Sequence, residues 1–83
     1  PMRANGDLFI NAVARGNIRI EVRSAVRDEP MEGWTAADCT PFTGDSLDLP
    51  VSWGEKTLKD LNGQIIRLRF SLDKATLYSF DIR

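Results

Sequence analysis

The chain has 83 residues, of which 42% are hydrophobic and 28% are charged, so its composition is that of a globular protein and not of a disordered one. This length predicts one small domain with a thin core and little room for a deep cleft. Eleven basic and twelve acidic residues give a formal net charge of -1, which does not favour nucleic-acid binding. The apolar runs are far shorter than the roughly 20 residues that cross a bilayer, so no membrane partner is expected.

Two residue types are absent or nearly absent. The sequence has no histidine, which removes the usual zinc ligands, the Ser-His-Asp triad and the most common general base. Cys39 is the only cysteine, so neither an internal disulfide nor a cysteine cluster for a metal can form. We therefore expect no catalytic constellation, no metal site and no cofactor. A lone thiol suits the cytosol and a secreted domain alike, so the compartment stays open.

The first third of the chain predicts a β-hairpin. Residues 7–14 are typical of a strand with two apolar faces, and residues 18–23 alternate apolar and charged side chains, as a half-buried strand does. Between them, Gly16 and Asn17 both tolerate a positive φ and so predict a tight turn at 15–17.

The middle of the chain carries weaker signals. After Pro30, residues 31–34 predict a short return strand, and residues 35–45 read as irregular, with a short turn at 36–38. Residues 47–53 alternate again, and Pro50 indicates either an edge strand or a place where the ladder of hydrogen bonds is interrupted. Its predicted apolar side consists of Leu47, Leu49, Val51 and Trp53.

The last third predicts a helical turn and a second hairpin. Residues 57–61 favour one helical turn before the strong turn dipeptide Asn62-Gly63. Residues 66–72 and 76–82 both alternate, and Asp73-Lys74 is expected to join them as a two-residue turn.

These elements predict an all-β fold: a small antiparallel β-sandwich, jelly-roll-like, or a partial barrel of about five to seven short strands. No segment has the long 3.6-residue period of a helix. The prediction depends on one apolar layer shared by both hairpins, formed by Ile18, Ile20, Val22, Ile66, Leu68 and Phe70.

The order of short motifs resembles a known bacterial module over nearly the whole chain. The motifs are Gly16-Asn17-Ile18-Arg19-Ile20-Glu21-Val22, Asp38-Cys39, Gly44-Asp45-Ser46, Val51-Ser52-Trp53, Leu61-Asn62-Gly63, Arg67-Leu68-Arg69-Phe70 and Ala75-Thr76-Leu77-Tyr78-Ser79-Phe80. They resemble the C-terminal β-sandwich of glycoside-hydrolase-like proteins whose larger domain is a five-bladed propeller of the invertase and levanase type.

The resemblance implies a non-catalytic accessory role beside a glycosidase-like domain and transfers no active-site residue. In such proteins the sugar-cleaving carboxylates lie in the propeller. The module usually has further strand material upstream, so residues 1–83 are expected to form a single β-sandwich domain that is N-terminally truncated. A missing strand would leave an open sheet edge, which favours a homodimer.

Three aromatic residues are candidates for carbohydrate binding, because flat rings suit the apolar side of a sugar: Trp34, Trp53 and Tyr78. The alternative is a packing role, which we favour for Trp53 and Tyr78 since aromatic residues dominate small cores. A carbohydrate-binding module that uses exposed aromatic residues is thus the alternative function.

Three further features have both a functional and a structural interpretation. Asp38, Asp45 and Asp48 could supply oxygen ligands for calcium, but their spacing matches no calcium loop, and a turn role is favoured for Asp45. An arginine stripe could bind an anionic glycan or an acidic surface, or simply be a solvated face balanced by Glu21; its members are Arg19, Arg23, Arg67 and Arg69. Cys39 is expected to be a buried small hydrophobe.

Overall fold

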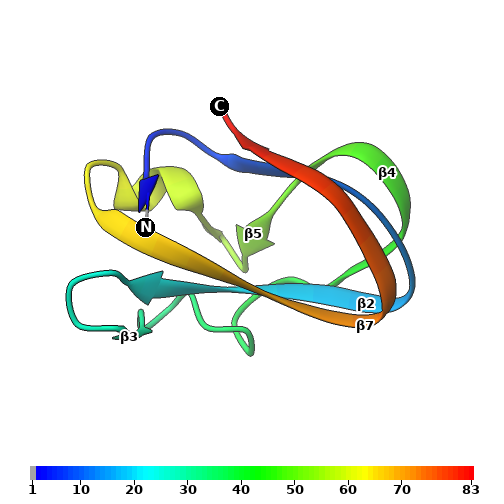
Figure 1. The fold of residues 1–83 in the computed structure, drawn as a ribbon, viewed down its shortest axis with the longest axis horizontal. Coiled ribbons are helices and arrows are strands. Elements are labelled where there is room, and N and C mark those ends of the chain that lie inside the picture. The colour runs from blue at the N-terminus through cyan, green and yellow to red at the C-terminus, as the bar shows by residue number, and fades with distance from the viewer. Residues whose placement is uncertain (1) are drawn as a thin grey trace.

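The computed structural model describes residues 2–83 and confirms the all-β class (Figure 1). Its strands are β1 (Met2–Arg3), β2 (Leu8–Ser24), β3 (Glu29–Pro30), β4 (Phe42–Pro50), β5 (Ser52–Trp53), β6 (Lys56–Thr57) and β7 (Ile65–Ile82). The 3-10 helix η1 (Leu58–Leu61) confirms the predicted helical turn. Within residues 2–83, no helix has the length and apolar character needed to span a membrane.

Two long strands form the frame of the molecule. β2 and β7 pair antiparallel from Leu8 opposite Ile82 to Ser24 opposite Ile66. Figure 1 shows that both strands curve together, so that the ribbon folds back over itself. We call residues 8–14 and 75–82 the upper arm of this ribbon, and residues 17–24 and 65–73 its lower arm.

The two predicted hairpins are wrong. Each predicted pair of strands is one bent strand, and the two segments expected to be turns lie opposite each other at the bend. Ala14 pairs with Ala75 and Asn17 with Asp73, so two residues of β2 face the single residue Lys74 of β7. In both β2 and β7, apolar and polar side chains alternate again after the polar residues at the bend. A hairpin would give the same sequence pattern as a single strand that bends and buries the same face on both sides of the bend.

β3 and β4 extend the sheet on the side of β2 that faces away from β7. β4 pairs with the first half of β2 and β3 with its end, whereas β1 pairs with β7 only at Ile65 and Ile66. β4 has a single partner strand among residues 2–83, which confirms that Pro50 lies on an edge strand. β5 and β6 form a separate two-stranded pair.

Three predictions for the middle of the chain need correction. Residues 42–45, expected to be irregular, belong to β4, and residues 31–34 form turns and bends instead of a return strand. Leu47 was expected inside but is 80% exposed. The cause is a bulge: Ile10 pairs with Leu49 and Ala12 with Ser46, so Leu47 falls among the extra residues of β4.

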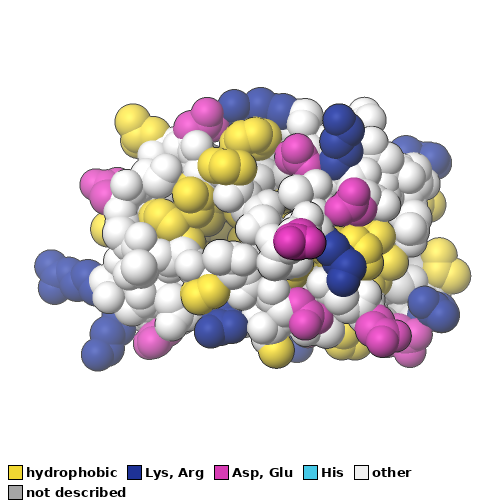
Figure 2. Space-filling model, turned by 180° about the vertical axis from the view of Figure 1, so that it is seen from behind, with side chains coloured by type: hydrophobic (Ala, Val, Ile, Leu, Met, Phe, Trp, Pro, Cys, Tyr) yellow, Lys and Arg dark blue, Asp and Glu magenta, His cyan; other side chains and the backbone are white. Residues whose placement is uncertain are grey.

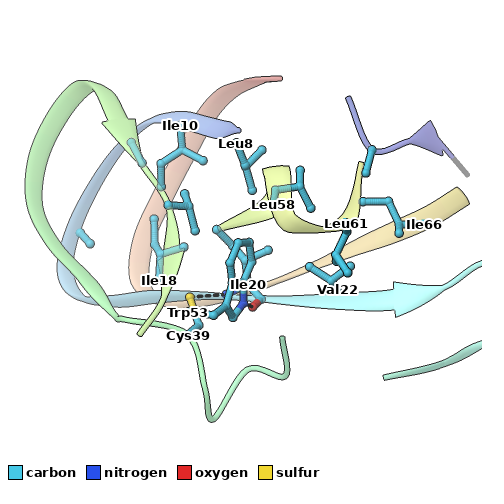
Figure 3. Packing of buried hydrophobic residues seen from close by; sticks show 14 residues of the cluster. Leu8, Ile10, Ile18, Ile20, Val22, Cys39, Trp53, Leu58, Leu61 and Ile66 are labelled. Atoms are coloured by element: carbon cyan, nitrogen blue, oxygen red, sulfur yellow. Dashed lines mark hydrogen bonds between the residues drawn. The ribbon is translucent and has the colours of Figure 1, made fainter. Parts of the chain in front are cut away.

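The apolar layer lies between the two arms (Figure 3). The predicted members Ile18, Ile20, Val22 and Ile66 are all buried, and Leu68 and Phe70 pack against them. Leu58 and Leu61 of η1 enter the same cluster from the other side, together with Val51 and Trp53. Every buried side-chain nitrogen or oxygen atom among the described residues has a hydrogen-bond partner.

Candidate functional site

Trp53 belongs to the core. Its side chain is 2% exposed, and its indole Nε1 donates a hydrogen bond to the backbone oxygen of Ile20 at 2.8 Å (Figure 3). The bond satisfies the one polar group of the ring at the centre of the apolar cluster. The packing role is confirmed for Trp53, and its ring is not available for stacking on a sugar.

Trp34 is half-buried and packs against the hydrophobic core. Its Nε1 donates to the backbone oxygen of Thr57 at 3.1 Å, and the Lys56 ammonium lies 5.5 Å from the ring centroid. The lysine therefore covers part of the ring in a cation–π contact. A sugar would have to displace Lys56 or stack on the part of the Trp34 ring that the lysine leaves uncovered.

Tyr78 is 65% exposed, so the core role favoured for it is wrong. Asn11 pairs with Ser79 while Ala12 pairs with Leu77, which makes Tyr78 the extra residue of a bulge. The bulge turns the ring away from the apolar layer. Tyr78 lies in the upper arm, whereas the backbone of Trp34 bonds to Val22 in the lower arm. The three aromatic candidates do not form one platform.

The three aspartates are in separate surroundings. Asp38 accepts hydrogen bonds from the hydroxyl and the backbone N–H of Thr35, and these bonds hold the pKa of Asp38 below its ordinary value. Asp48 binds Arg83, whose guanidinium lowers the pKa of that carboxyl. Asp45 lies within β4 opposite Val13, so the turn role favoured for it is wrong. Among the described residues, no three acidic, cysteine or histidine side chains gather as a metal site would require.

The four arginines do share one face. In the lower arm Arg23 pairs with Arg67, and Glu21 pairs with Arg69, so these side chains alternate outward from the apolar layer. The Glu21 carboxylate lies 2.9 Å from Arg23, and this hydrogen bond raises the pKa of the arginine. Asp28 lies within 3.9 Å of Arg67 as well. Acidic groups thus balance part of the positive charge on this face.

Cys39 is confirmed as a buried small residue. It is 3% exposed, and its Sγ accepts a hydrogen bond from the backbone N–H of Ile20 at 3.3 Å. Burial raises the pKa of the Cys39 thiol, which disfavours the reactive thiolate.

A cavity of about 200 Å³ lies beside β4. Its apolar walls include Ile10, Ile18, Ile20, Phe42, Leu49 and Val51, and hydroxyl groups of Thr40 and Ser52 stand at its polar side. Figure 2 shows hydrophobic side chains within a hollow on this face, toward the end of the molecule where β4 lies. Sequence reasoning missed this cavity, because its walls join residues of β2 to residues 39–43 and 49–52, which only the tertiary structure brings together.

The bend also creates an aromatic contact that the sequence pattern did not indicate. Phe70 of the lower arm and Phe80 of the upper arm are ten residues apart on one strand, yet their ring centroids are 5.3 Å apart. Phe80 is 42% exposed, and Leu72, which follows Phe70 by two residues, is 47% exposed. An apolar strip therefore reaches the surface along β7, separate from the cavity beside β4.

Comparison of the chain with protein-family models, with curated protein sequences and with solved structures yields no match.

Proposed function

We propose that the chain is a non-catalytic accessory module that packs against a neighbouring glycosidase-like domain and stabilises or orients it. The cavity beside β4 is the observation that carries the proposal. An apolar cavity of about 150 Å³ is large enough to hold a benzene ring. The cavity here, of about 200 Å³, therefore has room for one aliphatic or aromatic side chain that projects from an adjacent domain.

The lining of the cavity supports a protein surface as its partner. No charged side chain contributes to the walls, and the polar groups are neutral. The hydroxyls of Ser52 and Thr40 lie 3.3 Å apart, and Thr40 also accepts a hydrogen bond from the backbone of Gly54. An apolar centre beside neutral hydroxyls is the pattern of a protein interface core, where charged residues are depleted.

The resemblance to the C-terminal modules of propeller glycosidases supports the choice of neighbour. We expect the reading frame that encodes this chain to encode a five-bladed propeller domain as well. Deletion of residues 1–83 from that product should lower its melting temperature or solubility and leave its affinity for polysaccharide unchanged. Sequencing of the surrounding frame and calorimetry of the two proteins test this proposal. A frame without a propeller domain would contradict it.

A matched pair of leucine variants locates the contact. Leu49 lines the cavity, whereas Leu47, two residues earlier on the same strand, is 80% exposed and does not. Leu49→Asp should lower the melting temperature of the whole protein by several degrees, because a carboxylate in the cavity opposes entry of an apolar side chain. Leu47→Asp should leave it unchanged. Circular dichroism of the separate 83-residue chain controls for loss of the fold, and equal effects of both variants would exclude the cavity.

Exposure of Tyr78 favours one alternative, a carbohydrate-binding module. In that case Tyr78 and the free part of Trp34 would bind sugars, and Trp53 would not. Affinity electrophoresis in gels with neutral or anionic polysaccharides separates the two functions. Retardation that Tyr78→Ala or Trp34→Ala abolishes would favour sugar binding, and equal mobility in all gels would eliminate it.

A further inference from the structure

One edge of the sheet is unpaired over most of its length. Within residues 2–83, β7 pairs with β2 along one side, while on its other side β1 covers only Ile65 and Ile66. Residues 67–82 therefore present a free strand edge. Exposed edges of this length are templates for pairing with another chain.

The hydrogen bonds of Val22 define which backbone groups point to that edge. Its N–H donates to Trp34 and its carbonyl accepts from Met31, so both groups point away from β7. Val22 and its partner Leu68 therefore form a non-hydrogen-bonded pair, in which Leu68 also directs its N–H and carbonyl away from β2. By the alternation of antiparallel strands, Phe70 and Leu72 do the same.

The bend gives β7 a self-complementary pattern. The residues opposite buried positions of β2 are even-numbered before the bend, Leu68, Phe70 and Leu72, and odd-numbered just after it, Ala75 and Leu77. An antiparallel pairing of β7 with itself that matches the inner residues before the bend to those after it must use a register that joins even to odd positions. A two-fold axis between Asp73 and Lys74 gives such a register.

We propose that β7 pairs with β7 of a second copy of this chain about that axis. Leu72 then faces Ala75 of the second copy and Phe70 faces Leu77, so the inner apolar layer continues across the two chains. At the centre, Asp73 faces Lys74 of the second copy, and the symmetry repeats this attractive pair. The bends of the two strands lie side by side in this register. The pairing between the copies ends before Ile66, because β1 already covers the edge of β7 there.

Charge and exposure both support a second copy as the occupant. Beyond the bulge at Tyr78, Arg67 of one chain falls opposite Asp81 of the other, so opposite charges meet near both ends as well as at the centre. Leu72 and Phe80, which are 47% and 42% exposed, lie beside the edge that the second copy covers. The inference does not depend on the glycosidase-like neighbour, because the cavity lies on the opposite side of β2.

Sedimentation equilibrium of the 83-residue chain tests the proposal. The expected species has twice the monomer mass of 9.3 kDa. Lys74→Asp places acidic groups opposite each other at the centre and should raise the dimer dissociation constant by about tenfold or more. The charge exchange Asp73→Lys with Lys74→Asp restores two attractive pairs and should restore the dimer. Leu49→Asp, which lies on β4 and away from the free edge of β7, should leave the dimer intact once circular dichroism shows that the variant folds.

Amide hydrogen exchange gives an independent readout. The N–H groups of Phe70 and Leu72 should become protected as protein concentration rises, because they bond to the second copy, while those of Ser71 are protected at all concentrations. A wild-type chain that remains monomeric up to millimolar concentration would overturn the proposal. So would a dimer that Lys74→Asp does not weaken, or one whose formation leaves the Phe70 and Leu72 amides unprotected.

Discussion

The backbone carbonyl of Asp73 occupies the space that a β-carbon on Gly16 would need. Gly16 precedes Asn17, the residue that pairs with Asp73 at the bend of the β2–β7 ribbon, and neither Gly16 nor Asn17 has a positive φ. Glycine is required there for close backbone approach and not for the turn conformation that the sequence suggested.

Gly16→Ala should therefore destabilise the chain. The added methyl group must push β2 and β7 apart at the bend, which costs about 1–3 kcal/mol in tightly packed sites. Urea unfolding measures the loss. Arg15→Ala, an exposed neighbour at the same bulge, is the control and should change stability by less than about 0.5 kcal/mol. Similar losses in both variants would mean that the contact at Asp73 is not the cause.

Trp53→Phe should cost more than Trp34→Phe. The first substitution leaves the buried oxygen of Ile20 without its partner, which typically costs about 1–3 kcal/mol, and it also leaves empty volume in the core. Trp34 lies in a half-buried site where water can replace its hydrogen bond to Thr57. Chemical unfolding of both variants provides the comparison, and an equal or larger loss for Trp34→Phe would contradict this assignment.

Cys39 should react slowly with thiol reagents in the folded chain. Burial excludes the reagent and raises the pKa of the thiol, so both access and thiolate population are low. The rate should rise steeply through the urea transition, in parallel with the loss of circular dichroism. Fast, complete modification in the absence of denaturant would show that the loop carrying Cys39 opens without global unfolding.

Asp48 should make the chain sensitive to acid. Arg83 lowers the pKa of Asp48 in the folded state from about 3.8, so the unfolded state binds the proton more readily. The resulting stability is fully present above that unfolded value and is lost as the pH falls through the lowered folded value. Asp48→Asn should flatten this part of the stability curve, measured by urea unfolding between pH 2 and pH 6.

Local periodicity in the sequence predicted the composition of the core well. The alternation around Ile18 and Ile66 identifies the inner face, and the burial of both residues confirms it. Connectivity between strands was beyond its reach, because a polar pair such as Asp73-Lys74 interrupts alternation in the same way at a turn and at a bulge. The exposed position of Tyr78 has the same origin: an extra residue changes the face, and only the register with β2 reveals it.

The candidate binding surfaces were harder to predict from the sequence than the core, because they are formed by residues that only the tertiary structure brings together. The cavity joins residues of β2 to the loop before β4, and the contact between Phe70 and Phe80 exists only because β7 folds back on itself. Residue types alone did indicate that the Arg23 and Arg67 side chains share a face, since both alternate with inner apolar positions.

The pairing of Leu8 with Ile82 has a kinetic consequence. The main ladder joins segments that are far apart in the sequence, so its loop-closure entropy must be overcome before most native contacts form. Chains dominated by such distant pairings fold in milliseconds to seconds, far more slowly than helical bundles of equal size. On the ribosome, β3 and β4 can pair with β2 as they emerge, but the β2–β7 ribbon cannot assemble until β7 has been synthesised.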